Sequence, residues 1–266
     1  MSAPGAPRSV RDAFPANWPF RIGVVLLIAY VVYAAQILEV TWARFLIGLD
    51  QGGRFIARMI PPDIAADKPG LLLQGMQESL QIAILATVFG TLIALPLGLA
   101  AARNLAPAPV AWTARTVIVL FRTFHPVIVA ILFVKAVGFG ALAGMMALTV
   151  ASVGFVGKLI AEAAEEMSMK QVEAVRATGA SFMGVIVMAV MPQILPRFIG
   201  FTAYELDSNL RNSALVGIVG GGGIGATLFT AFQRFDYDFV LTIVLTIIAL
   251  VMIGEVISGW MRRLFQ

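Results

Sequence analysis

The sequence contains no cysteine, only one histidine and few charged residues, which make up 13% of its 266 residues. The absence of cysteine excludes a disulfide framework and a thiolate metal site. With His125 as the single histidine, neither a zinc site nor a nucleophile–base pair has the residues it needs. We therefore expect a chain that is not an enzyme, with no catalytic residue and no metal ion or other cofactor of its own.

Hydrophobic residues, by contrast, make up 59% of the chain, well above their share in soluble domains. Uncharged runs cover residues 22–38, 79–102, 136–157 and 239–254. At about 1.5 Å per residue, the run 79–102 exceeds a hydrocarbon layer of about 30 Å. These runs predict an all-α polytopic membrane protein that lies in the lipid bilayer.

Six transmembrane helices account best for the hydrophobic pattern. We place them at residues 20–39, 76–102, 115–136, 138–160, 194–218 and 238–260. Arg122, His125 and Pro126 interrupt the third stretch, so five spans remain an alternative. Residues 1–19, which hold four prolines, are expected to form a disordered cytoplasmic tail ahead of a single transmembrane domain over 20–266.

The distribution of lysine and arginine predicts the orientation. With six spans, eleven of these residues fall in segments on one side of the membrane and six in segments on the other. The positive-inside rule makes the richer side cytoplasmic, with both termini on that side and a first outer loop at about 40–75. The net charge of +4 therefore reflects topology, and we expect no nucleic-acid partner.

The longest predicted cytoplasmic loop covers residues 158–192 and is rich in helix-forming residues. Gly179 is expected to end its helix, because glycine readily adopts the left-handed conformation of a helix C-cap. A short helix, a glycine turn and a second short segment would form a compact projection that suits docking into a groove of a soluble partner. The alternative is an ordinary solvated connection between two spans.

Part of this loop resembles a motif of bacterial ABC importer permeases, in which E-A-A is followed by three residues, G, nine residues, I, one residue and L-P. The matching positions are Glu173, Ala174, Gly179 and Pro192, and the departing ones are Val175, Ala189 and Met191. All three departures are apolar. The literal E-A-A at 162–164 does not fit, because its glycine position falls on Ser168.

Longer stretches resemble the permease subunit of phosphonate importers. They are "VEAVRATGA", "MPQILP", the spacing Glu205-x3-Asn209-x-Arg211-x-Ser213, "VGIVGGGGIGATL" and, in the predicted outer loop, "MIPPD". The resemblance covers most of the chain from about residue 55 to the end. Its glycine block is shared with methionine-type permeases and marks the larger group.

The resemblance implies a type I ABC importer permease fold in a bacterial cytoplasmic (inner) membrane. It implies a homodimer that works with two copies of an ATPase subunit, which would bind ATP and Mg²⁺, and with an extracytoplasmic substrate-binding protein. The cargo would be a phosphonate or a related phosphorus oxyanion. The loop around 169–179 would be the coupling helix that docks into the ATPase. The coupling residues implied are Glu173, Ala174, Arg176, Gly179 and Pro192.

Three charged residues interrupt the fifth predicted span. On an insertion scale, the strong apolar residues of 197–217 contribute about −2 to −4 kcal/mol, whereas three ionised groups cost about 8–10 kcal/mol. The segment must therefore be shielded from lipid. Asp207 and Arg211 lie four residues apart and can pair, whereas Glu205 lies on another face and needs a different partner.

Two hypotheses for this polar set remain open. It lines a translocation path between two copies of the chain, or it forms a buried salt-bridge network that fixes helix packing. The residues concerned are Glu205, Asp207, Asn209, Arg211 and Ser213. A function of another class, an ion- or proton-coupled secondary transporter that uses Glu205 and Asp207, is the alternative to an ATP-driven importer.

A glycine-rich block follows, and it holds a regular helix poorly. Its members are Gly217, Gly220, Gly221, Gly222, Gly223 and Gly225. At membrane depth, irregular backbone is tolerated only where protein or water satisfies its polar groups. We predict a helix break or re-entrant turn at an outer gate. Close helix packing, for example through Gly217 and Gly221, is the alternative.

Overall fold

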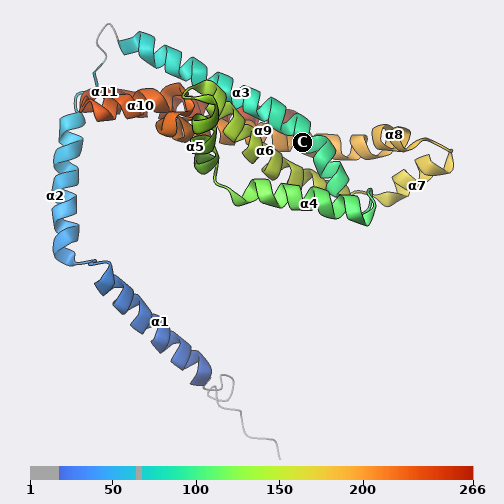
Figure 1. Cartoon of the computed structure of the whole chain (residues 1–266), viewed down its shortest axis with the longest axis horizontal. Helices are drawn as coiled ribbons and strands as arrows, with labels where there is room; N and C mark the ends of the chain where they lie inside the picture. The colour runs from blue at the N-terminus through green and yellow to red at the C-terminus, as the bar shows by residue number, and fades with distance from the viewer. Residues whose placement is uncertain (1–17, 64–67, 266) are drawn as a thin grey trace, which may run out of the picture. The chain divides into compact units, whose positions relative to one another are not determined.

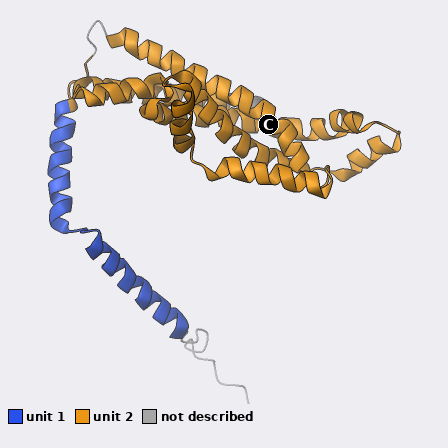
Figure 2. Ribbon diagram, in the orientation of Figure 1, with its two compact units in different colours: residues 1–58 blue, residues 59–266 orange. Residues whose placement is uncertain are grey.

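The computed structural model describes residues 18–63 and 68–265, and every regular element within these ranges is a helix. The chain divides into two units, residues 1–58 and 59–266, which are described separately (Figure 2). The tail predicted for 1–19 lies outside the described residues up to residue 17. Its last two residues, Trp18 and Pro19, already belong to the first helix.

The first unit holds α1 (Trp18–Ile37) and most of α2 (Trp42–Met59) (Figure 1). The 20 residues of α1 are long and apolar enough to cross a membrane, as the sequence predicts. The segment 40–75, predicted as an outer loop, instead contains the 18 residues of α2 and the start of the next helix at Lys68. Hydropathy does not detect α2, because charged residues recur along one of its faces.

The second unit contains the remaining helices. They are α3 (Lys68–Ala101), α4 (Ala108–Thr123), α5 (Pro126–Val137), α6 (Ala141–Glu165), α7 (Met169–Ala177), α8 (Phe182–Val185), α9 (Met191–Val216), α10 (Gly223–Gln233) and α11 (Tyr237–Phe265). Two π-helical turns, η2 (Ile186–Val190) and η3 (Gly217–Gly221), lie before and after α9.

The long helices α3 and α6 pack closely along the centre of this unit. A Cβ atom added at Gly90 would lie 2.4 Å from the Cβ of Ser152, and one at Gly98 would lie 2.7 Å from the Cβ of Ile160. Such a close approach requires residues without side chains at these positions. The outer surfaces of α3, α5 and α11 carry many exposed large hydrophobic residues, as expected for a lipid-facing bundle.

The third predicted span is not one straight helix. It consists of α4 and α5, which are bent by 89° after Thr123. His125 is the N-cap of α5 and its side chain accepts a hydrogen bond from the Val127 N–H at 3.3 Å. Pro126 starts the new helix, where a missing N–H is tolerated. The prediction of a single helix at 115–136 is therefore wrong.

The bent pair nevertheless connects the two ends of the second unit. Near its start, the Nε of Arg115 donates to the Ala101 carbonyl, at the end of α3, at 2.9 Å. Just beyond its end, the Gly140 N–H donates to the Gly220 carbonyl, after α9, at 2.9 Å. The described residues thus hold five helices long and apolar enough to cross a membrane, or six spans if the bent pair counts as one.

The connection that follows α6 is shorter than the predicted loop 158–192. α6 continues to Glu165, and an almost unbroken helical path runs from Phe182 to Gly221. Pro192 does not interrupt this path, because it lies in the first turn of α9. The projecting segment is therefore 166–181.

Candidate functional site

The short helix α7 lies at the end of the second unit where α3 stops and α6 turns into α9. Val172 is fully buried, and Val175 packs against the same apolar cluster, which includes Val185 and Ala189. The exposed residues of the predicted coupling set on α7 are Glu173, Ala174 and Arg176. The helix thus rests on the bundle with its apolar face and presents its charged face outward.

The motif positions around α7 have clear structural places. Gly179 follows the helix with a φ of 79°, which confirms the predicted left-handed turn. Pro192 is exposed on the first turn of α9. Val175 and Ala189, which depart from the motif, contribute to the apolar cluster, where volume and polarity matter more than identity.

Side chains of α9 fix the segment that carries α7. The Oε1 of Gln193 accepts a hydrogen bond from the Ser168 N–H at 3.0 Å. Arg197 forms an ion pair with Glu166, with 2.7 Å between Nη1 and Oε2. Both contacts join the start of α9 to the residues between α6 and α7.

The literal E-A-A string at 162–164 has a different place. Ala163 and Ala164 are buried at the end of α6. The next residue, Glu165, accepts a hydrogen bond from Nη2 of Arg115 at 2.7 Å and from the Arg103 N–H at 2.9 Å. This part of the chain therefore packs the end of α6 against α4 and the end of α3.

The polar residues of α9 divide between two faces. Glu205, with 4% exposure, Asn209 and Ser213 are buried inside the second unit. The Glu205 Oε1 accepts from the Ser152 hydroxyl at 2.7 Å. Asn209 Nδ2 donates to Ser152 Oγ at 2.8 Å and to Thr87 Oγ1 at 3.0 Å. These side chains form one hydrogen-bonded cluster across α3, α6 and α9.

Arg211 lies on the other face and pairs with Asp207, as the spacing predicts. Arg211 Nη2 lies 2.6 Å from Asp207 Oδ2, and the side chains are 59% and 11% exposed. Glu205 is thus not part of this ion pair. It has no ion-pair partner within the part of the chain that the structure describes.

Three further polar residues, which the sequence did not predict as part of the site, lie on the face of Arg211. Tyr204 is exposed, and the Asn212 Nδ2 donates to the Ser208 hydroxyl at 3.3 Å. Steps of three or four residues from Arg211 reach Ser208 and Tyr204, so helical spacing contains the signal that could have found them. We call Tyr204, Asp207, Ser208, Arg211 and Asn212 the α9 polar face.

The glycine block forms the predicted break. Gly220 and Gly222 have φ values of 99° and 77°, which residues other than glycine rarely adopt. After them, α10 folds back along the end of α9. A Cβ at Gly225 would lie 1.9 Å from the Ala214 carbonyl oxygen, and one at Gly217 would lie 2.8 Å from the Gly225 Cα.

The same glycines also pack closely, so the helix break and close helix packing occur together. Gly217 packs on Gly225 of α10. Gly221 packs on α6 instead, because a Cβ added at Gly144 would lie 2.2 Å from the Gly221 carbonyl oxygen. A Cβ at Gly223, whose φ is 72°, would lie 2.5 Å from the Ser79 hydroxyl. Gly217 and Gly221 therefore do not share one partner helix.

The sequence and fold match a known group of transport proteins. A family described as "Binding-protein-dependent transport system inner membrane component" matches residues 94–266. The chain belongs to this family. The permease is therefore a multi-pass protein of the inner membrane, as the sequence predicts.

Two curated relatives are similar to this permease. It is 37% identical over 258 residues to the phosphite transport system permease protein PtxC of Stutzerimonas stutzeri, covering 95% of this chain and 92% of that one. It is 38% identical over 207 residues to the phosphate-import permease protein PhnE of Mycolicibacterium smegmatis, covering 77% of this chain. The match spans only 38% of that longer relative.

A solved structure shares the fold. The permease superposes on a chain of the inward-facing MetNI methionine ABC transporter with a TM-score of 0.68 at 24% sequence identity. The match covers 76% of the permease and all of the other chain. The predicted all-α importer-permease fold is confirmed.

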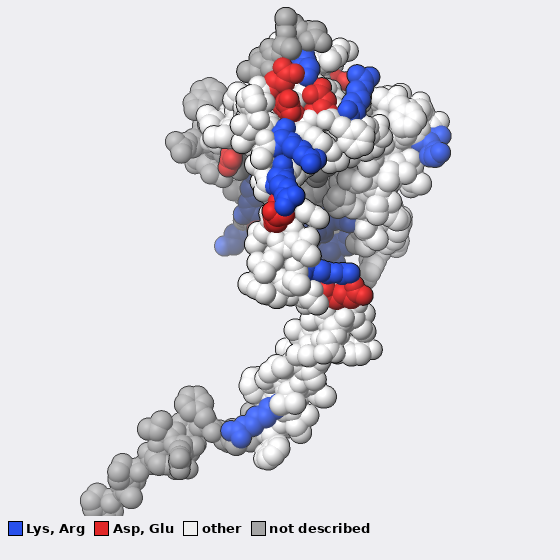
Figure 3. All heavy atoms as spheres, turned by 90° about the vertical axis from the view of Figure 1, so that its left-hand side faces the viewer, with Lys and Arg blue, Asp and Glu red and all other residues white. Residues whose placement is uncertain are grey.

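The end of the permease opposite α7 carries a cluster of charged side chains. Lys68 forms ion pairs with Asp63 and, at 3.0 Å, with Asp236, and its Nζ lies 4.8 Å from the Phe239 ring centroid. The Thr242 hydroxyl donates to the Asp63 carbonyl at 2.8 Å. Figure 3 views the protein from this end and shows acidic and basic side chains next to one another there. The cluster holds the start of α3 to the connection between α10 and α11.

Proposed function

We propose that this permease forms half of the transmembrane path of an ATP-driven importer and carries a phosphorus oxyanion. The substrate class comes from the phosphite and phosphate-import permeases, which match 95% and 77% of this chain. A phosphonate, phosphite or phosphate would each fit this class. Selectivity would rest mainly with an extracytoplasmic binding protein that delivers the anion.

The observation that carries this proposal is an exposed arginine at membrane depth. The side chain of Arg211 is 59% exposed on α9, and three polar neighbours share its face. A lipid-facing arginine at the bilayer centre costs about 2.5–3.5 kcal/mol or more. The α9 polar face is therefore turned toward a second copy of the chain, and the two copies enclose a hydrated path.

The charge balance of this face suits passage better than tight binding. Asp207 neutralises Arg211, but it accepts from only one of the five guanidinium N–H groups. The remaining donors can contact a passing oxyanion through charge-assisted hydrogen bonds. A neutral pair offers such contacts without holding the anion strongly.

The buried cluster around Glu205 serves the path indirectly. Glu205, Asn209 and Ser152 are buried inside one chain, where the Ser152 hydroxyl donates to Glu205 and accepts from Asn209. They fix the rotation of α9 and so the direction of the α9 polar face. A proton-coupled transporter would need Glu205 to exchange protons with water, and its 4% exposure gives no support to that alternative.

Coupling to ATP would occur through α7. Its exposed residues Glu173, Ala174 and Arg176 would dock into a groove of an ATPase subunit that holds ATP and Mg²⁺, with one ATPase for each permease. Movement of α7 would reach α9 through the Gln193–Ser168 and Arg197–Glu166 contacts. The glycine break at the far end of α9 would then act as the outer gate.

A double variant tests whether Arg211 serves the path or only the packing. In vesicles that contain the permease, its ATPase and its binding protein, Asp207→Asn/Arg211→Gln removes both charges of the pair, so that neither is left without its partner. We expect the protein to remain folded and ATP-dependent uptake of phosphite to fall at least tenfold. Normal uptake by this variant would contradict the proposed path. Wild-type uptake that continues without ATP hydrolysis would contradict an ATP-driven importer.

A further inference from the structure

The helix α2 separates apolar from charged residues on its surface. With 3.6 residues per turn, one set of large apolar side chains lies within an arc of about 140°. The set is Trp42, Phe45, Leu46, Leu49, Ile56 and Met59. Ile47 and Phe55 fall outside this arc. We call it the α2 apolar face; five of its members are at least half exposed, and Met59 is partly buried.

The opposite face of α2 carries the charged residues of this helix. Arg54 pairs with Asp50 at 2.8 Å, and Arg44 pairs with Glu39 in the preceding turn. Arg58 forms no ion pair among the residues that the structure describes. The helix and its turn therefore keep a net positive charge, which is complementary to anionic phospholipid headgroups.

The position of α2 in the chain places it at a membrane surface. It connects α1 and α3, both long and apolar enough to cross the membrane. The start of α3 is joined to the α10–α11 connection through Lys68 and Asp236, at the end of the second unit opposite α7. Met59, which belongs to this unit, packs with Ile224 and Phe239 at that same end. A helix between two spans, joined to this end, begins and ends near the outer surface of the bilayer.

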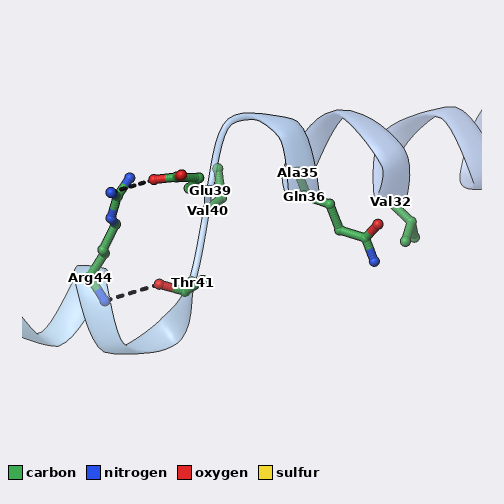
Figure 4. Close-up of a pocket in the computed structure, with 7 residues that line it drawn as sticks. All are labelled: Val32, Ala35, Gln36, Glu39, Val40, Thr41 and Arg44. Atoms are coloured by element: carbon green, nitrogen blue, oxygen red, sulfur yellow. Dashed lines mark hydrogen bonds and ion pairs between the residues drawn. The ribbon is translucent and has the colours of Figure 1, made fainter.

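The turn into α2 is well defined. Arg44 reaches back to Glu39, and its N–H donates to the Thr41 hydroxyl at 3.3 Å (Figure 4). Trp42 then stacks on Phe45, with ring centroids 5.2 Å apart. Trp18 begins α1 and Trp42 follows its other end, and tryptophan prefers the boundary between headgroups and acyl chains.

We propose that α2 lies in the outer interface of the membrane, with the α2 apolar face embedded among acyl chains and Arg58 among headgroups. Its occupant is the phospholipid surface. An 18-residue helix with a wide apolar face and a cationic opposite face has the composition of an interfacial helix. In water, this face would form a large contiguous apolar patch.

Site-directed spin labelling of the full permease in phospholipid nanodiscs tests this placement. The chain has no cysteine, so single-cysteine variants need no other change. Phe45→Cys and Leu49→Cys report the apolar face. Ala43→Cys and Gln51→Cys are matched controls two residues away, rotated by about 200° around the helix. Accessibility to oxygen, which concentrates in lipid, is compared with accessibility to a water-soluble nickel complex.

We expect the oxygen-to-nickel ratio to be at least threefold higher at positions 45 and 49 than at 43 and 51. Equal, high nickel accessibility at all four positions would mean that α2 stands in water. Shielding of positions 45 and 49 from both reagents would mean that protein, such as a second copy, covers the face. Either result would overturn the proposal.

Discussion

At the scale of single residues, the most demanding feature is the carboxyl group of Glu205. It is buried at membrane depth without a basic partner in the described part of the chain. A buried polar group is tolerated when its hydrogen bonds are made, and becomes costly when a partner is removed. Ser152 donates to it, and Asn209 and Thr87 complete the chain of hydrogen bonds.

The Ser152→Ala variant should therefore destabilise the permease by about 1–3 kcal/mol, because Glu205 and Asn209 both lose a partner. Thr149→Ala is the matched control on the same helix, since the Thr149 hydroxyl donates only to the Met145 carbonyl within α6. It should change the free energy of unfolding by less than about 1 kcal/mol. Denaturant unfolding in detergent measures both variants, and equal effects would contradict the cluster's role.

At the scale of elements, the break between α9 and α10 combines two requirements for glycine. Gly220 and Gly222 need positive φ, and Gly225 lets α10 lie directly on the backbone of α9. Ser79 satisfies one buried backbone group at the start of α10, because its hydroxyl accepts from the Ile224 N–H at 2.9 Å. Together with the Gly220 carbonyl, which accepts from the Gly140 N–H, two backbone groups at the break are thus bonded to protein.

The Gly225→Ala variant should separate α10 from α9, because its Cβ would lie 1.9 Å from the Ala214 carbonyl oxygen. We expect a loss of about 1–3 kcal/mol in stability or more. Gly200→Ala is the control within α9, where nothing lies within 4 Å of an added Cβ. It should be neutral or stabilising by up to about 1 kcal/mol. Unfolding midpoints that leave Gly225→Ala unchanged would contradict this packing.

The helices and turns also show which features can be predicted from the sequence alone. Hydropathy and glycine content predict most spans, the turn at Gly179 and the break after α9, because each depends on local composition. The sequence predicts too long a loop at 158–192, because Pro192 suggests a helix end but lies in the first turn of α9. The partners of Glu205 and Asn209 lie 53 and 122 residues away in the sequence, so only packing brings them together.

At the scale of the whole molecule, α9 links the two ends of the transmembrane unit. It begins beside the segment that carries α7 and ends at the glycine break. Between these ends it carries the α9 polar face and the buried Glu205 cluster. If α7 docks into an ATPase as proposed, a push on it would reach the α9 polar face and the outer end through one helix of 26 residues.

Two exposed carboxylates distinguish the proposed coupling surface on α7 from the literal E-A-A string on α6. Glu173 lies on the exposed face of α7, whereas Glu162 belongs to the E-A-A string of α6 and pairs with Lys158 at 3.2 Å. Glu173→Gln should lower co-purification of the ATPase and uptake per ATP hydrolysed by about tenfold, because one charge-assisted contact is worth about 1.4 kcal/mol or more. Glu162→Gln should leave both unchanged. Thermal unfolding of the isolated permease should be the same for both variants, since both side chains are exposed. The reverse pattern, with Glu162 required and Glu173 dispensable, would move the docking surface from α7 to the end of α6.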